Sequence, residues 1–221
     1  MRTPERLAYG RIANAYDAFL TFSGFKRGVE HFLDRLDLRL PSSPAIMDAG
    51  CGTGLMSRYL AKRFPDARII AADIDGNMLR EMERLVAEEG SHGAKLTIAE
   101  GDLAAPDRIR LFRTGETAII PENHFDAIFV SGALEHVPLG ESVRHLAKLL
   151  KPGGIFFNLG VRRNPAGAVL GMVYRFRPYR LAEMRSSCES AGLEDIRVLR
   201  LKAEDFPANL SRIAVIAKKS I

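Results

Sequence analysis

A glycine-rich turn carries the first chemistry that the sequence offers. Residues 48–54 read DAGCGTG and follow the short apolar run 45–49, so the turn leads from a predicted strand into a predicted helix. Glycines let the backbone bend sharply and approach a ligand closely, because no Cβ stands in the way. At the carboxyl edge of a parallel sheet, such a turn is the usual site of a nucleotide-derived cofactor.

The spacing within this turn decides among cofactors. It reads G-x-G-x-G, and Leu55 stands where the dinucleotide fingerprint needs its third glycine. The sequence G-K-[ST] of a phosphate-binding P-loop is also absent. Asp48, two residues before Gly50, suits a cofactor that has a cationic end and no phosphate. S-adenosylmethionine, with its ammonium and sulfonium groups, has these properties.

Two further carboxylates follow the ends of predicted strands. Asp73 ends the apolar run 68–73 and can accept hydrogen bonds from both hydroxyls of a ribose. An aspartate in this position often caps the next helix, but Asp75 is better placed for the cap, which leaves Asp73 for a ligand. Asp102 follows the next run, where it either accepts a hydrogen bond from an adenine amino group or serves as a solvated turn residue.

The order of these motifs resembles that of the class I S-adenosylmethionine-dependent methyltransferases. The resemblance covers nearly the whole chain and includes DAGCGTG, AADIDGNML, GDL, FDAIFVSGALEHV, LLKPGG, AGLEDIRV and IAVIAKK. The element IANAYD at residues 12–17 looks like the small-molecule branch of the family, which contains the quinone-biosynthesis methyltransferases. The sequence departs from the family at 104–124, a long polar connection where a short loop is usual.

The resemblance implies S-adenosyl-L-methionine as cofactor and S-adenosyl-L-homocysteine as product. It assigns the methionine end to Asp48 and the glycine turn, and the ribose to Asp73. The adenine falls to Asp102, the cofactor amine to the backbone of Ser131, and Tyr16 would close over the site. The implied cofactor-binding residues are Tyr16, Asp48, Gly50, Cys51, Gly52, Gly54, Asp73, Ile74, Asp102, Leu103 and Ser131.

The elements that must position these residues follow from the apolar pattern. Short apolar runs alternate with amphipathic stretches, which predicts an α/β fold with helices on both faces of a mostly parallel sheet. Strands are predicted at 45–49, 68–73, 95–99, 125–131, 155–160, 195–201 and 213–218. Helices are predicted at 25–40, 54–63, 76–89, 140–150 and 180–191. The resemblance implies a Rossmann-like sheet of seven strands, in the order 3-2-1-4-5-7-6, with strand 7 antiparallel.

The length and composition fit one methyltransferase domain over 1–221, in which residues 1–40 form an N-terminal helical cap over the cofactor site. The formal net charge of +5 permits an anionic substrate but is low for a nucleic-acid binder, which excludes DNA as a partner and argues against RNA. Cys51 and Cys188 have no metal-ligand spacing, so no metal is expected. With no signal-peptide pattern and no long apolar run, a cytoplasmic location is expected.

Residues 131–136, at the exit of the fourth predicted strand, limit the kinds of methyl acceptor that the sequence allows. Methyl transfer needs alignment and a dry site, with a base only where the acceptor requires one. The exit lacks the [DNS]-P-P-[YFW] tetrapeptide of families that methylate amino groups, and no cysteine nucleophile for pyrimidine C5 lies near it. His136 is a candidate general base, because histidine titrates near neutral pH. A histidine that merely caps or packs is the alternative.

Residues 161–180 hold five arginines, three aromatic residues and no acidic residue. Arginine offers forked donors to a carboxylate or phosphate, and an aromatic ring covers an apolar or planar body. We therefore expect Arg175, Arg177 and Tyr179 to bind the acceptor, in a segment that serves as an acceptor-site lid. An amphiphilic anionic acceptor, or transient contact with an anionic membrane surface, would use these features. A solvated basic loop is the alternative.

These features predict an enzyme that transfers a methyl group from S-adenosylmethionine to a small-molecule or lipid-like acceptor, and an anionic acceptor would suit its charge. Two other functions remain open at this point. One is an RNA or protein methyltransferase, and the other is a catalytically silent protein that binds the same cofactor. The pattern names neither the acceptor nor an oligomeric state.

Overall fold

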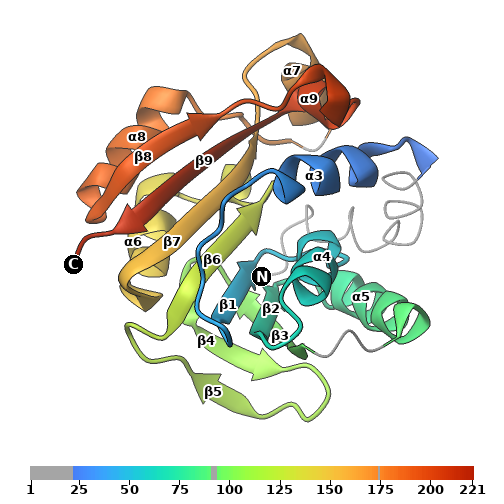
Figure 1. Cartoon of the computed structure of the whole chain (residues 1–221), viewed down its shortest axis with the longest axis vertical. Coiled ribbons are helices and arrows are strands. Elements are labelled where there is room, and N and C mark those ends of the chain that lie inside the picture. The colour runs from blue at the N-terminus through green and yellow to red at the C-terminus, as the bar shows by residue number, and fades with distance from the viewer. Residues whose placement is uncertain (1–21, 91–93, 174) are drawn as a thin grey trace.

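The computed structural model of the chain describes residues 22–90, 94–173 and 175–221. Within these ranges, nine strands form one sheet (Figure 1). The strands are β1 (Ala45–Ala49), β2 (Arg68–Asp73), β3 (Lys95–Asp102), β4 (Ala105–Leu111), β5 (Thr117–Ile119), β6 (Phe125–Ser131), β7 (Leu150–Val161), β8 (Leu193–Leu199) and β9 (Arg212–Lys219). Their order across the sheet is β5-β4-β3-β2-β1-β6-β7-β9-β8.

Helices cover both faces of this sheet, as the apolar pattern predicts. The helices are α3 (Phe25–Asp34), α4 (Leu55–Arg63), α5 (Gly76–Glu89), α6 (Leu139–Leu149), α7 (Pro165–Val173), α8 (Leu181–Ser190) and α9 (Ala208–Ser211), with the 3₁₀ turns η1 (Leu134–His136) and η2 (Ala203–Asp205). Phe157 of β7 packs in the core with α3, α4 and α9, whereas its neighbour Phe156 packs in the core with α6 and α8. Successive side chains of a buried strand thus supply the two cores.

The prediction of seven strands in the order 3-2-1-4-5-7-6 is wrong for this sheet, because the connection 104–124 is not a loop. It contains β4 and β5, an antiparallel hairpin that extends the sheet beyond β3. Ile109 and Ile120 from this connection are buried in the same core cluster as Ala99 of β3. At the other end of the sheet, β9 runs antiparallel to both β7 and β8.

The first described helix is shorter than its apolar spacing predicts. The spacing favours a helix over 25–40, but α3 ends at Asp34 and Arg35 is its C-cap. Arg63 of α4 donates to the carbonyl of Leu36 at 2.5 Å, so this carbonyl does not support another helical turn. The remainder of the predicted cap, residues 1–21, lies outside the described residues.

Five parallel strands define the edge at which function is expected. β3, β2, β1, β6 and β7 pair in parallel, so their carboxyl ends meet along one edge of the sheet. The glycine turn after β1 and the predicted ligand residues Asp73, Asp102 and Ser131 all lie along this edge. Among the helices that the structure describes, none is long and apolar enough to cross a bilayer.

Candidate functional site at the carboxyl edge of the sheet

The glycine turn is anchored to the neighbouring strand by its backbone. The amides of Gly50 and Cys51 donate to the carbonyl of Ala72, at 2.8 and 3.1 Å. Gly50 has φ of +73°, and a Cβ there would lie 2.3 Å from the Cβ of Ala133, in the loop after β6. Glycine is therefore required where the two loops touch, and the contact brings the β6 exit beside the turn.

Gly52, at the tip of the turn, is hydrogen-bonded to a carboxylate and faces open space. Its amide donates to Oδ2 of Asp73 at 2.8 Å, and the other oxygen of Asp73 accepts from the amide of Asp75 at 2.9 Å. A Cβ at Gly52 would meet no atom of the described residues within 4 Å, although its φ of +55° disfavours any side chain. The turn thus presents backbone to a free space beside Asp73, which still has acceptor capacity on both oxygens.

Asp75 has the role that its position in the sequence predicts. It is the N-cap of α5, and its carboxylate accepts from the amide of Asn77 at 2.9 Å. This confirms that the cap of α5 does not use Asp73.

Asp48 lies deeper than a ligand-facing role suggests. Its side chain is fully buried beneath the turn and accepts a hydrogen bond from the hydroxyl of Ser57 on α4, while Oδ1 has no partner. Burial raises the pKa of Asp48 to about 7, the Ser57 bonds act against this rise, and the charge of Asp73 adds to it. Burial also raises the pKa of Asp73, against the hydrogen bonds from Asp75 and Gly52.

The remaining predicted cofactor residues lie around the same opening. Asp102 ends β3 and accepts from the amide of Ala104 at 2.9 Å, in an exposed turn. Leu103 is half-buried, and its Cδ1 lies 3.6 Å from where a Cβ of Gly50 would stand. Ile74 is 41% exposed, which is unusual for an isoleucine at the end of a buried strand. Tyr16 lies outside the described residues.

The two cysteines are unsuited to nucleophilic catalysis. Burial raises the pKa of Cys51 well above its usual range, and the charges of Asp73 and Asp48 add to this effect. Burial also raises the pKa of Cys188, to about 12. Because the thiolate is the reactive form, neither thiol supplies a nucleophile at neutral pH.

The exit of β6 brings buried polar groups together that the sequence did not mark. Glu135 is buried, its Oε1 accepts from the amide of Val161 at 2.6 Å, and its Oε2 has no partner. Asn158 of β7 is 3% exposed, and its Oδ1 also lacks a partner. A Cβ at Gly160 would lie 3.0 Å from Nδ2 of Asn158 and 3.2 Å from Oε1 of Glu135. An asparagine inside the apolar run FFNLG was the available sequence signal for this site.

The predicted catalytic and acceptor residues occupy the rim of this exit. His136 is exposed, and its ring meets that of Phe176 edge-on, with 5.0 Å between centroids. Tyr179 is half-buried and donates to the carbonyl of Val137 at 2.8 Å, which fixes it to the loop after η1. Arg175 and Arg177 are exposed, and Arg177 lies 3.9 Å from a carboxylate oxygen of Glu183. The structure therefore brings His136 and Tyr179 to the exit, and Arg175 and Arg177 to its solvent side.

A cluster of acidic residues and a histidine lies apart from this edge. His31, Glu204 and Asp205 each place one ligand atom within 4.8 Å of the others. The guanidinium of Arg35 donates to both oxygens of Asp205, at 2.8 and 2.7 Å. Burial alone would raise the pKa of Asp205, but the hydrogen bonds from Arg35, the Lys202 backbone and His31 hold it below its usual value. The guanidinium occupies the place of a cation, so the cluster joins α3 to η2 as an ion-pair network.

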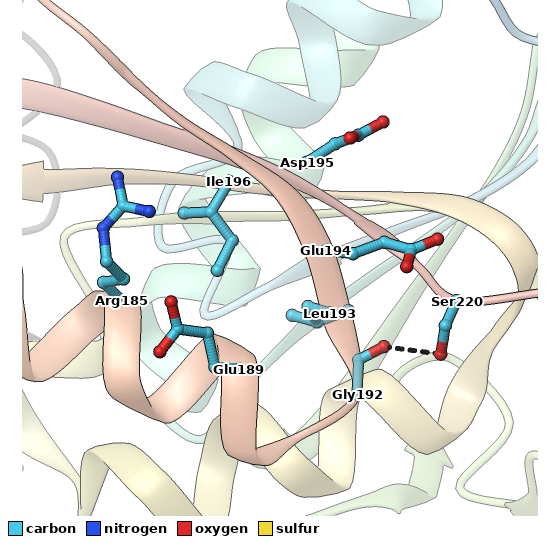
Figure 2. Close-up of a pocket in the computed structure, with 8 residues that line it drawn as sticks. All are labelled: Arg185, Glu189, Gly192, Leu193, Glu194, Asp195, Ile196 and Ser220. Atoms are coloured by element: carbon cyan, nitrogen blue, oxygen red, sulfur yellow. Dashed lines mark hydrogen bonds between the residues drawn. The ribbon is translucent and has the colours of Figure 1, made fainter.

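A hollow between α8 and β8 also lies away from the site. Figure 2 shows it among side chains that include Glu189, Leu193 and Glu194, beside the hydrogen bond from Ser220 to the carbonyl of Gly192. β8 begins here, and it runs parallel to β7 because both are antiparallel to β9. The hollow therefore lies at the amino ends of the strands, opposite the glycine turn.

Comparison with known proteins agrees with the geometry of the carboxyl edge. Residues 47–156, which run from β1 through the glycine turn to β7, match the methyltransferase domain family. The chain belongs to the S-adenosylmethionine-dependent methyltransferases. The malonyl-[acyl-carrier protein] O-methyltransferase of Acetivibrio thermocellus is 37% identical over 98 residues, which are 44% of this chain and 34% of that protein.

Other members of the family match more of the chain. The demethylmenaquinone methyltransferase of Thermus thermophilus is 28% identical over 212 residues, covering 95% of this chain and 89% of that protein. A putative methyltransferase, solved in complex with the Haloferax volcanii Trm112 activator, has a TM-score of 0.73 and 15% identity, with all of both chains covered. The chain spans less than half the length of the malonyl-[acyl-carrier protein] relatives that it matches, for example 34% and 47% of two of them.

Proposed function

We propose that this chain transfers a methyl group from S-adenosylmethionine to a small-molecule or lipid-like acceptor. The observation that carries the proposal is the open space above Gly52, next to the carboxylate of Asp73 and at the same edge as Asp102 and Ser131. In this assignment Asp73 accepts from the ribose and Asp102 from the adenine, and the backbone of Ser131 faces the cofactor amine. A bound cofactor would supply the methyl group, and the protein supplies alignment and exclusion of water.

The named relatives support the class of acceptor. They act on malonyl-[acyl-carrier protein] and on demethylmenaquinone, which are a carrier-linked acyl group and a quinone. The rim of the β6 exit has matching features, with the ring of Phe176 against His136 and exposed arginines beside it. We assign residues 161–180, including α7, as the lid over the acceptor. The exposed apolar side chains of α7, with Arg175 and Arg177, would serve an amphiphilic acceptor or contact with an anionic lipid surface.

Substitution at Gly52 tests the cofactor site. We expect Gly52→Val to abolish binding of S-adenosylmethionine and S-adenosylhomocysteine in calorimetry, because its side chain fills the space that the cofactor needs. Gly153→Val is the matched control, since Gly153 has a similar φ of +75° and open space where a Cβ would stand, but it lies near the start of β7, away from the glycine turn. Both variants should lose about 1–2 kcal/mol of stability through backbone strain. Wild-type affinity in Gly52→Val would contradict the assignment, and binding without methyl transfer to any extract fraction would indicate a silent cofactor-binding protein.

His136 is assigned as the general base for an oxygen or carbon acid. Its exposed ring stands on η1, directly beyond the exit of β6. His136→Ala should lower kcat by about 100-fold or more, with the dissociation constant of S-adenosylhomocysteine nearly unchanged. His124→Ala is the control, because His124 precedes β6 at the opposite end of the strand. An unchanged kcat would leave the ring of His136 as a packing partner of Phe176.

A further inference from the structure

Arg212 lies at the carboxyl edge of the parallel strands, and it is not one of the assigned cofactor-binding residues. It is the first residue of β9 and pairs with Val161, the last residue of β7. Its guanidinium lies over the ring of Phe25 on α3, with 5.1 Å from Cζ to the ring centroid. A cation over an aromatic face is held in a fixed orientation, so this side chain is positioned rather than solvated.

Two of the three guanidinium nitrogens of Arg212 lack partners. Nε and Nη1 are buried and make no hydrogen bond, and no carboxylate of the described residues lies within salt-bridge distance of Arg212. The nearby Arg162, in contrast, donates to the carbonyl of Asn209 at 3.0 Å. A buried N–H without an acceptor is destabilising, and arginine is charged at every physiological pH. An arrangement of this kind calls for an anion that the described residues do not supply.

The guanidinium points toward the β6 exit. Its third nitrogen, Nη2, lies 3.8 Å from the position that a Cβ of Gly132 would take. Gly132 directly follows Ser131, and the next residue, Ala133, touches Gly50 of the glycine turn. Because Gly132 has no side chain, it does not separate the guanidinium of Arg212 from the space beyond the end of β6.

We propose that Arg212 binds a carboxylate or phosphate of a ligand seated at the β6 exit. This inference rests on the proposed function, because it places the anion on a ligand of the methyl-transfer site. The guanidinium presents its donors in two pairs, Nε with Nη2 and Nη1 with Nη2, so each nitrogen without a partner can act together with Nη2 on the two oxygens of such a group. Two ligands can supply the anion, namely the carboxylate of the amino-acid end of the cofactor and an anionic group of the acceptor.

Arg212→Gln and Arg212→Lys test the site, with Arg197→Gln on the exposed surface of β8 as the control. The first arm measures binding of S-adenosylhomocysteine and of its decarboxylated analogue by calorimetry. If the anion is the cofactor carboxylate, Arg212→Gln weakens the binding of S-adenosylhomocysteine by about tenfold or more and leaves the binding of the decarboxylated analogue unchanged. Arg212→Lys keeps the charge without the fork and should recover part of this loss.

The second arm follows labelled methyl transfer into extract molecules that an anion-exchange resin retains. If the anion belongs to the acceptor, Arg212→Gln loses transfer into this fraction while its affinity for S-adenosylhomocysteine stays at the wild-type value. If the wild type binds S-adenosylhomocysteine, wild-type behaviour of Arg212→Gln in both arms would overturn the proposal that Arg212 binds an anion of a ligand of this site.

A third arm separates failure of this site from failure of the proposed function. Malonate or inorganic phosphate should raise the Tm of the wild-type protein and of Arg197→Gln above that in sodium chloride of equal ionic strength, and should not raise that of Arg212→Gln. If the wild type binds no S-adenosylhomocysteine but shows this difference, the methyl-transfer assignment fails and an anion site at Arg212 stands. If the wild type binds S-adenosylhomocysteine without any difference between the variants in the three arms, the anion site fails alone.

Discussion

The carboxylates of Asp48 and Asp73 lie close to the glycine turn, and they differ in their hydrogen-bond partners. Asp73 has the amides of Gly52 and Asp75 to stabilise its charge, whereas Asp48 has hydrogen bonds from Ser57 and an oxygen without a partner. Hydrogen bonds from amides favour the ionised form, and burial disfavours it. Asp48 is therefore the carboxyl that gains a proton first as the pH falls, and a cationic ligand above the turn would oppose that gain.

The raised pKa of Asp48 predicts a pH dependence of stability. Its folded-state value of about 7 exceeds the ordinary value of 3.8, so the folded protein holds the proton more tightly than the unfolded chain does. The stabilisation that this proton provides is fully present below about pH 4 and is lost as the pH rises through 7. The free energy of unfolding falls by roughly 4 kcal/mol at most as a result. Urea unfolding of the ligand-free protein between these values should therefore show a smaller decline with pH in Asp48→Asn than in the wild type.

The control for this measurement is Asp66→Asn, because Asp66 is exposed. It should follow the wild-type curve. Equal slopes for the wild type and Asp48→Asn would mean that Asp48 is ionised in the folded protein across the whole range.

At the level of single residues, the sequence predicts roles that depend on local spacing. The capping role of Asp75 follows from its distance to the helix that begins at Gly76, and the structure confirms it. The full burial of Asp48 and the approach of Arg212 to Gly132 depend on chain segments more than 70 residues apart. No local pattern records such contacts, so these features emerge only from the fold.

Among the elements, the hairpin of β4 and β5 is the main departure from the predicted fold. The segment 104–124 is mostly polar, and its apolar residues are too sparse to mark strands. β4 nevertheless pairs with β3, and its buried side chains include Pro106 and Ile109. The hairpin also contacts α6, where Nδ1 of His145 lies 2.9 Å from the carbonyl oxygen of Ala104. An edge hairpin needs only a few buried side chains, which explains why the pattern resembles that of a loop.

Two isoleucines of this region test whether the hairpin contributes to stability. Ile109 is 3% exposed in the core, whereas Ile119 of β5 is 74% exposed. Ile109→Ala should lower the free energy of unfolding by about 2–5 kcal/mol, because it leaves a cavity between the hairpin and β3. Ile119→Ala should change it by less than about 0.5 kcal/mol. Similar small losses in both variants, measured by urea denaturation, would show that the hairpin is not part of the cooperative core.

Across the whole molecule, the sequence predicts the parallel centre of the sheet better than its margins. The central strands β1, β2 and β6 are short apolar runs buried on both faces, a pattern with few alternatives. The margins include the β4–β5 hairpin, the early end of α3 and the helix α7 within the segment 161–180. These margins are held by tertiary contacts, such as that of Arg63 with Leu36, which override helical spacing.

Several exposed apolar side chains of the described residues lie near one end of the molecule. Val169 and Met172 of α7 are 61% and 83% exposed, and Leu210 of α9 is 50% exposed. α7 and α9 lie next to each other beyond the end of β7, on the side of the molecule that α3 also borders (Figure 1). The exposed Arg175 and Arg177 follow α7 directly. Apolar side chains beside arginines match the interfacial region of an anionic lipid layer, where the site would meet a lipid-like acceptor.

Co-sedimentation with vesicles tests this surface. We expect the wild-type protein to sediment with vesicles rich in phosphatidylserine, and less so with neutral vesicles or at high salt, because charge attraction is screened over about 8–10 Å near physiological ionic strength. Val169→Ser with Met172→Ser should reduce sedimentation by removing insertion, and Arg175→Gln with Arg177→Gln should reduce it by removing the charge. Ile119→Ser is the control, because it removes an equally exposed apolar side chain at the distant hairpin. S-adenosylhomocysteine affinity should stay constant in all of these variants. Unchanged sedimentation in both double variants would assign the arginines and the apolar face of α7 to the acceptor lid alone.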